Sequence, residues 1–255
     1  MILGIDVGNT HVVIGSIEGD AVKSLARIAT DKNKTEFEYA GILANANRFY
    51  GDPEDPVEGV VISSVVPAVT ASLKGAVHML YGFEPLVVGA GIKTGLNIRI
   101  DDPAQLGSDL VVGSVGALAL CPPPIIVIDL GTATTVCAVD KTGSFCGGAI
   151  VPGVRLSMNA LSGTASLLPQ INVEAPARCI GTNTVACMQS GAVFGTAAML
   201  DGLIDRMEEE LGSKASLIAT GGLATSVVPH CRHKIQVEPD LLLLGLAKIW
   251  QKNNR

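Results

Sequence analysis

The strongest constraint on the fold is an internal repeat. An apolar run at 2–5 ends in Asp6-Val7-Gly8-Asn9, and a second apolar run follows it. The same order recurs where the run at 125–128 leads into Asp129-Leu130-Gly131-Thr132. Aspartates 6 and 129 are 123 positions apart, about half of the 255-residue chain. Each copy therefore predicts a strand, a tight polar loop and a second strand that ends in a turn.

The rest of the pattern predicts mixed α/β layers in both halves. A capping box at Thr35-Glu36-Phe37-Glu38 begins a helix that runs toward Tyr50, before a stop at Gly51-Asp52-Pro53. Asp102-Pro103 predicts a helix start, with the helix continuing to Leu120. Pro122-Pro123-Pro124 separates two expected domains, 1–121 and 122–255. Further strands are expected at 59–63, 86–88 and 217–219, and further helices at 67–81, 154–161, 185–211 and 239–251.

Both loops have the chemistry of a phosphate-binding turn. Gly8 and Gly131 remove an obstructing Cβ, and residues 8–10 and 131–134 supply backbone N–H donors. An Asp at a strand end repels phosphate directly, but it can hold a hydrated cation that neutralises phosphate charge. One such loop also occurs in ordinary hairpins, whereas two copies favour a nucleotide held from both sides. Additional short side-chain donors are Asn9, Thr10, Thr132, Thr134 and Thr135.

A third glycine-containing turn follows the strand expected at 217–219. Thr220-Gly221-Gly222 would bring backbone close to a flat ligand such as adenine or ribose. By itself the same turn could simply lead into a helix.

Composition excludes several classes of partner. Hydrophobic residues make up 48% and charged residues 16%, which predicts a folded core rather than disorder. The net charge of −6 without a basic run argues against nucleic acid or an anionic membrane as partner. The longest apolar stretches are shorter than the roughly 20 residues that span a bilayer. The apolar run after Met1 lacks a basic leader region, so we expect a cytoplasmic protein.

The six cysteines include no C-x-x-C pair, which predicts reduced and mostly buried thiols. His230-Cys231-Arg232-His233 offers potential metal ligands. No second cluster completes a four-ligand set, so the sequence favours no metal site there.

The chain resembles the type III pantothenate kinases, also called the Bvg accessory factor family, of the actin, sugar-kinase and heat-shock-chaperone ATPase superfamily. The resemblance implies an α/β fold of two duplicated actin-like (ribonuclease H-like) halves with a nucleotide cleft between them. The motifs that carry it span nearly the full length: 6–10, Ile62-Ser63-Ser64-Val65-Val66-Pro67, Gly107-Ser108-Asp109, 129–134, 147–153, Gly181-Thr182-Asn183-Thr184, Gln189-Ser190-Gly191 and 220–222.

The resemblance implies phosphorylation of the terminal hydroxyl of pantothenate by ATP, the first step of coenzyme A synthesis, in a homodimer. Asp109 would be the general base. Asp6 would hold Mg²⁺ through water, and Asp129 would hold K⁺ or NH₄⁺. The other expected ATP contacts are Val7, Gly8, Asn9, Thr10, His11, Val12, Val13, Thr132, Gly221 and Gly222. The expected pantothenate contacts are Ile100, Gly107, Ser108, Asp109, Leu110 and Thr184.

Two positions on the substrate side depart from the family pattern. The family usually has Arg after the catalytic Asp, where this chain has Leu110, and Tyr where it has Ile100. Loss of a guanidinium removes a fork suited to the carboxylate of pantothenate. Three readings therefore remain open: a pantothenate kinase with a rearranged pocket, a kinase for another small hydroxyl-bearing acceptor, and a nucleotide-binding regulator without transfer activity.

Overall fold

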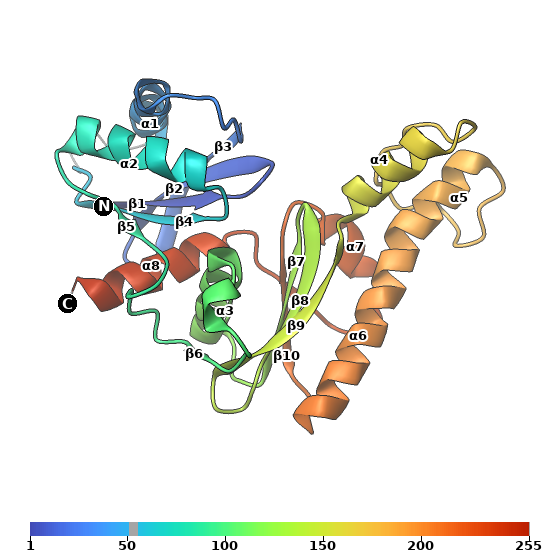
Figure 1. Cartoon of the computed structure of the whole chain (residues 1–255). Helices are drawn as coiled ribbons and strands as arrows, with labels where there is room; N and C mark the ends of the chain where they lie inside the picture. Colours follow the sequence, from blue (N-terminus) through green and yellow to red (C-terminus); the bar gives the residue numbers. More distant parts are fainter. Residues whose placement is uncertain (51–55, 255) are drawn as a thin grey trace. The chain divides into compact units, whose positions relative to one another are not determined.

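The computed structural model describes residues 1–50 and 56–254. The chain divides into two compact α/β units (Figure 1). The first contains the described residues of Met1–Leu96, Asp101–Leu120 and Asp240–Arg255, and the second contains Asn97–Ile100 and Cys121–Pro239. The ranges 1–121 and 122–255, with a cleft between them, stay a prediction. By its contacts the C-terminal helix belongs to the first unit.

The first unit is built on a five-stranded sheet of order β3-β2-β1-β4-β5. Strand β1 pairs antiparallel with β2 and parallel with β4, so Asp6 lies opposite Val13 on one side and Ser63 on the other. The strands are β1 (Ile2–Val7), β2 (His11–Glu18), β3 (Ala21–Ala29), β4 (Gly59–Ser64) and β5 (Leu86–Val87).

Helices cover both faces of this sheet. Because side chains alternate along a strand, Leu3, Ile5 and Val7 share a face and join a buried core with residues of α1 (Glu36–Tyr50) and α2 (Pro67–Tyr81). The opposite face packs against α8 (Leu241–Asn253), which crosses α3 (Ser108–Leu120). Figure 1 shows α1 and α2 on one side of these strands and α3 and α8 on the other.

The second unit has a six-stranded sheet of order β11-β10-β7-β8-β9-β6. Its core lies between this sheet and the long helix α6 (Thr196–Leu211), through residues such as Ile128, Leu200 and Ile204. The strands are β6 (Asn97–Ile98), β7 (Ile125–Leu130), β8 (Ala133–Val139), β9 (Ser144–Pro152), β10 (Ser216–Thr220) and β11 (Gln236–Val237). The other helical segments of this unit are α4 (Val154–Thr164), α5 (Thr184–Ser190), a π-turn η2 (Gly191–Gly195), α7 (Ala224–Val227) and the 3₁₀ turn η3 (Val228–His230). The first unit also has a 3₁₀ turn, η1 (Pro103–Gln105).

Most predicted elements are confirmed. The capping box forms, since the Thr35 backbone N–H donates to Glu38 Oε2 at 2.8 Å and the Glu38 N–H donates to Thr35 Oγ1 at 3.3 Å. The helix expected at 185–211 exists as α5 and α6, but a π-turn interrupts it. The stop expected at Gly51-Asp52-Pro53 lies outside the described residues. All six cysteines are free, but the expectation that most of them are buried is wrong. Only Cys137 is buried, whereas Cys146, Cys179 and Cys187 are exposed, because they lie at the surface of β9, of the irregular segment before α5 and of α5. Among the described helices, none has the length and apolar character needed to span a bilayer.

The continuous helix predicted from Asp102 to Leu120 is wrong. Asp102 does cap a turn, because its Oδ1 accepts from the Ala104 N–H at 3.1 Å, but this turn is the short η1. The chain then becomes extended at Leu106, with φ −71° and ψ 122°, and α3 begins afresh at Ser108. The physical cause is a tertiary anchor at Ser108, described below, which outweighs the local start signal.

The crossing of α3 and α8 depends on glycine. A Cβ at Gly245 would lie 2.0 Å from the Val112 carbonyl oxygen, and one at Gly116 would lie 2.4 Å from the Leu241 oxygen. Backbone atoms therefore meet directly between the two helices, which leaves no room for any side chain at these positions.

We predict that Gly245→Ala destabilises the first unit by about 1–3 kcal/mol, because the added methyl forces the two helices apart. The only tryptophan, Trp250, lies on α8, so its fluorescence during urea unfolding reports this unit. The control is Gly41→Ala in α1, where nothing lies within 4 Å of the added Cβ. That change should stabilise the helix by about 0.5–1 kcal/mol. Equal stability of the two variants would contradict the close crossing.

Candidate functional site

The first predicted phosphate loop is the tight connection between β1 and β2. The Gly8 N–H donates to the His11 carbonyl oxygen at 3.0 Å, which closes the turn. Thr30, just after β3, braces it from the side: its Oγ1 donates to the Gly8 oxygen at 2.7 Å, and its N–H donates to the Thr10 oxygen at 2.9 Å. Asn9, Thr10 and His11 are exposed at the tip.

Not every residue expected to contact ATP presents its side chain at this loop. Val7 and Val12 are 1% and 0% exposed and belong to the core under α1 and α2. Only their backbone atoms could reach a ligand. Asp6, by contrast, is half-buried at the end of β1 and shares a sheet face with its register partner Ser63.

A serine bridge joins this strand end to α3. Ser108 Oγ lies 3.2 Å from Ser63 Oγ, donates to the Ser64 carbonyl oxygen at 3.0 Å and accepts from the Ser64 N–H at 3.0 Å. Because Ser63 pairs with Asp6 across the sheet, the bridge holds the start of α3 beside the edge where Asp6 lies. Asp109 is the next residue along.

Asp109 lies in the first turn of α3, not inside a longer helix. Its Oδ1 accepts from the Leu110 N–H at 2.9 Å, and the carboxyl is half-buried. The positive end of the helix dipole stabilises a carboxylate at this position. A Cβ at Gly107 would lie 2.4 Å from Asp109 Oδ1, so a larger residue at position 107 would displace the Asp109 carboxyl. The structure therefore brings Asp6, Ser108 and Asp109 to one edge of one unit.

The second loop repeats the first in the other unit. The Gly131 N–H donates to the Ala133 oxygen at 3.1 Å, as Gly8 does to His11. Thr132 is exposed, and its carbonyl oxygen accepts from the Gly153 N–H at 3.1 Å. Gly153 precedes α4, so the N-terminus of an 11-residue helix packs against this loop. A Cβ at Gly153 would lie 2.3 Å from the Thr132 oxygen. The Gly131 and Gly153 N–H groups are thus used within the protein, and the N–H groups that could meet an anion are those of the first turn of α4.

The Thr220-Gly221-Gly222 turn closes over Asp129. Strand β10 runs parallel to β7 with Thr220 opposite Asp129. Gly221, at φ +96°, then passes so close that a Cβ would lie 2.5 Å from Asp129 Oδ1 and 2.6 Å from the Leu130 backbone. Asp129 is thus surrounded by backbone of two loops, while Gly222 is exposed next to them.

The expectation that Thr134 adds a donor at this loop is wrong. Thr134 pairs with Leu130 in the sheet, whereas Thr135 pairs with Asp129. Side chains alternate between faces, so the Thr134 hydroxyl points with Leu130 toward the helices, away from the Asp129 face. It is 1% exposed, and its Oγ1 has no hydrogen-bond partner among the described residues.

The residues expected to bind pantothenate fall in both units. Gly107, Ser108, Asp109 and Leu110 belong to the first unit. Ile100, after β6, and Thr184, at the start of α5, belong to the second. Thr184 is exposed, and the preceding Asn183 caps its helix by accepting from the Ala186 N–H at 2.9 Å. The Ser108 hydroxyl is already used by β4, which makes it an anchor within the unit.

Sequence reasoning did not identify three residues that position the site. Thr30 hydrogen-bonds the first loop, Ser63 contacts Ser108, and the missing side chain of Gly153 lets the start of α4 pack against the second loop. Ser63 and Gly153 stand inside motifs of the family resemblance, but nothing local in the sequence shows what they contact. Thr30 follows an alternating stretch at 21–29, which could have indicated a third strand ending at the loop.

Comparisons with a family model and with related proteins indicate the same family. A family model described as type III pantothenate kinase matches residues 2–206. A type III pantothenate kinase of Moorella thermoacetica is 42% identical over 253 residues, covering 99% of this chain and 100% of that protein.

Solved structures show the fold. A Baf family protein of Campylobacter jejuni superposes with a TM-score of 0.64 at 16% identity, covering 99% of this chain and 98% of its own. A ROK family glucokinase of Streptomyces griseus, solved with glucose and AMPPNP, gives a TM-score of 0.50 at 16% identity, over 97% of this chain and 98% of that one. The expected actin-like and sugar-kinase fold is confirmed.

We predict that Gly221→Ala disrupts the second loop, because the methyl would overlap Asp129 and Leu130 and alanine disfavours positive φ. The cost should be about 2–4 kcal/mol, measured by thermal unfolding followed by circular dichroism. In the control Gly163→Ala, within α4, nothing lies within 4 Å of the new Cβ. Its stability should stay within about 1 kcal/mol of the parent chain. An equally stable Gly221→Ala protein would show that Gly221 does not closely approach Asp129.

Proposed function

The chain belongs to the type III pantothenate kinase family, and we propose that Asp109 is the base of its ATP-dependent phosphorylation of pantothenate. The observation that carries this proposal is the serine bridge. It holds Asp109 at the strand edge where Asp6 and the first phosphate loop lie. The phosphorylation itself, at the entry to coenzyme A synthesis, follows from the family.

Phosphoryl transfer asks for alignment and charge neutralisation more than for covalent chemistry. The backbone donors of the two glycine loops and the N-terminus of α4 suit the phosphate oxygens of ATP. Asp109, held in the first turn of α3, accepts the proton of the pantothenate hydroxyl as that oxygen attacks the terminal phosphorus. The phosphoryl group moves to the hydroxyl oxygen, and ADP leaves with the electron pair of the broken bond.

The chain's carboxylates fit the two cations that we infer. Asp6 is half-buried at a strand end, which suits a hydrated Mg²⁺. Asp129 lies in a cradle that any Cβ at Gly221 would fill, and its carboxylate would be an oxygen ligand for K⁺ or NH₄⁺. When bound, both cations would offset the negative charge of the phosphates. Asp6 and Asp129 would hold them.

The base assignment predicts that Asp109→Asn lowers kcat about 10²–10⁴-fold, because the amide cannot accept the proton. ATP affinity should stay within about threefold, since Asp109 is not part of either loop. ADP release is followed by a coupled assay with pantothenate, Mg²⁺ and K⁺. The matched control is Asp101→Asn, an exposed aspartate eight residues earlier in the chain, which should turn over like the parent protein. Undiminished kcat in Asp109→Asn would remove Asp109 from this role.

We also propose that the chain forms a homodimer through the exposed segment around α4 and α5. Residues 165–183 form no helix or strand, and long irregular segments of this kind are uncommon unless they bind something. Apolar side chains gathered on an exposed surface favour burial against a partner. From the end of β9 to the start of α5, the exposed large apolar side chains are Ile150, Leu156, Leu161, Leu167, Ile180 and Val185.

The dimer proposal predicts that the double variant Leu167→Ser/Ile180→Ser weakens self-association. These side chains are 92% and 84% exposed in the single chain. Losing two buried anchors of about 2 kcal/mol each, about 4 kcal/mol together, should raise the dimer Kd about 10³-fold, as measured by sedimentation equilibrium. Phe37→Ser, at a 74% exposed position on α1, is the control and should leave the Kd unchanged. A monomeric parent chain would contradict the proposal outright.

A further inference from the structure

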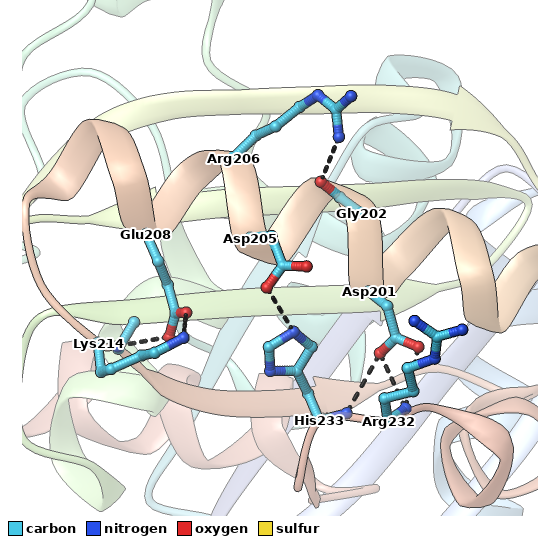
Figure 2. A network of polar contacts seen from close by, with 9 residues as sticks. Asp201, Gly202, Asp205, Arg206, Glu208, Lys214, Arg232 and His233 are labelled. Atoms are coloured by element: carbon cyan, nitrogen blue, oxygen red, sulfur yellow. Dashed lines mark hydrogen bonds and ion pairs between the residues drawn. The ribbon is translucent and has the colours of Figure 1, made fainter.

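A second cluster of potential ligands lies at the far end of α6 from the π-turn. Asp205 and Glu208 are three residues apart on this helix and therefore share a face. His233, from the segment after η3, points at them (Figure 2). One ligand atom from each of the three side chains lies within 4.8 Å of the other two. None of these residues belongs to either phosphate loop.

The position of His233 is fixed by a buried carboxylate. Asp201, one helical turn before Asp205, is 8% exposed. Its oxygens accept from the Arg232 N–H at 2.9 and 3.0 Å and from the His233 N–H at 3.2 Å. This anchor ties the backbone of the 232–233 segment to α6, and Asp205 Oδ1 then lies 3.0 Å from His233 Nε2. Figure 2 shows these contacts along one side of the helix.

Glu208 is also held in place. It is 7% exposed, and its Oε1 accepts from the Ala215 N–H at 3.0 Å. Its other oxygen pairs with Lys214 Nζ at 2.6 Å. The Lys214 side chain is 82% exposed, so water can solvate the ammonium if it leaves. Only the ammonium end of this pair is exposed, and a divalent cation carries twice its charge, so the cation would compete with Lys214 for the Glu208 carboxylate.

We propose that Asp205, Glu208 and His233 bind a divalent first-row transition metal, with Zn²⁺ as the best match. An imidazole nitrogen with two carboxylate oxygens suits these ions, whereas Mg²⁺ and Ca²⁺ prefer oxygen ligands alone. Zn–N and Zn–O bonds of about 2.0–2.2 Å place ligand atoms of a tetrahedral site roughly 3.5 Å apart. The three ligand atoms lie within 4.8 Å of one another, so metal binding would draw them together by about 1 Å through small side-chain rotations. Water would occupy the fourth position.

The sequence alone argued against this site, because His230-Cys231-Arg232-His233 has no second cluster nearby in the chain. The fold supplies that second cluster from α6, 28 positions before His233. The metal would tie the end of α6 to the segment that leads into β11. This inference is independent of the proposed kinase residues.

The test is a calorimetric titration of the full chain with ZnCl₂ in excess Mg²⁺, which saturates sites that prefer hard cations. Asp205→Asn and His233→Gln should each weaken one Zn²⁺ site at least about 100-fold, because loss of a direct ligand costs more than the 10-fold to 100-fold loss seen when a group that only supports a ligand is removed. Glu209→Gln removes the same charge from the same helix outside the triad, and His230→Gln removes a neighbouring imidazole. Both controls should bind as the parent chain does.

Lys214→Ala provides a variant that should gain affinity, because the competing ammonium is removed from Glu208. Loss of affinity or no change in this variant would overturn the assignment of Glu208 as a ligand. Circular dichroism shows whether each variant is folded. If His233→Gln unfolds, Asp205→Asn still tests the site, because Asp205 is exposed and its replacement should not disturb the fold. Identical Zn²⁺ isotherms in the parent, Asp205→Asn and His233→Gln proteins would overturn the site and leave an ion-pair network.

Discussion

The parallel pairing of a central strand with its neighbour is the constraint on which both candidate loops depend. In the first unit, β1 and β4 run together and end together, so Ser63 lies beside Asp6. Ser108 then fastens α3 to that end, and Asp109 arrives with it. In the second unit, β7 and β10 pair in the same sense, and Gly221 closes over Asp129. The same parallel strand pairing therefore places Asp109 next to the first loop and the Gly221 turn next to the second.

The repeat is thus symmetric in backbone and asymmetric in chemistry. The first loop has a carboxylate on a helix N-terminus as its neighbour, which suits proton transfer. At the second loop the Gly221 turn packs on Asp129 and the start of α4 packs on Thr132, an arrangement that we propose for a cation and phosphate oxygens. Leu110 stands directly after Asp109, the proposed base, and its aliphatic side chain offers pantothenate no charge. Recognition of its carboxylate must come from other residues of this family member.

Local signals in the sequence predicted the parts that depend on local physics. The two strand–loop–strand repeats, the Thr35 capping box and the helix at 67–81 all follow from patterns within a few residues. The strands β3 and β9 were missed because neither has the continuous apolar run that marks the central strands. Strand β3 alternates exposed and half-buried residues, and β9 is fully buried only at Ser144 and Phe145. The register of β8 against β7 explains why the Thr134 side chain turned away from its loop. The break before Ser108 depends on a contact 45 residues away, which no local signal reveals.

Phosphorylation of pantothenate by this chain is tested most directly by measuring the product. Purified protein is incubated with ATP, Mg²⁺, K⁺ and pantothenate, and phosphorylated pantothenate is measured by mass spectrometry alongside ADP. We predict that phosphorylated pantothenate and ADP form in equal amounts and that ADP release depends on pantothenate. Tight ATP binding without phosphorylated pantothenate would contradict it. That result would leave a nucleotide-binding protein that has kept the paired loops and lost the acceptor chemistry beside Leu110.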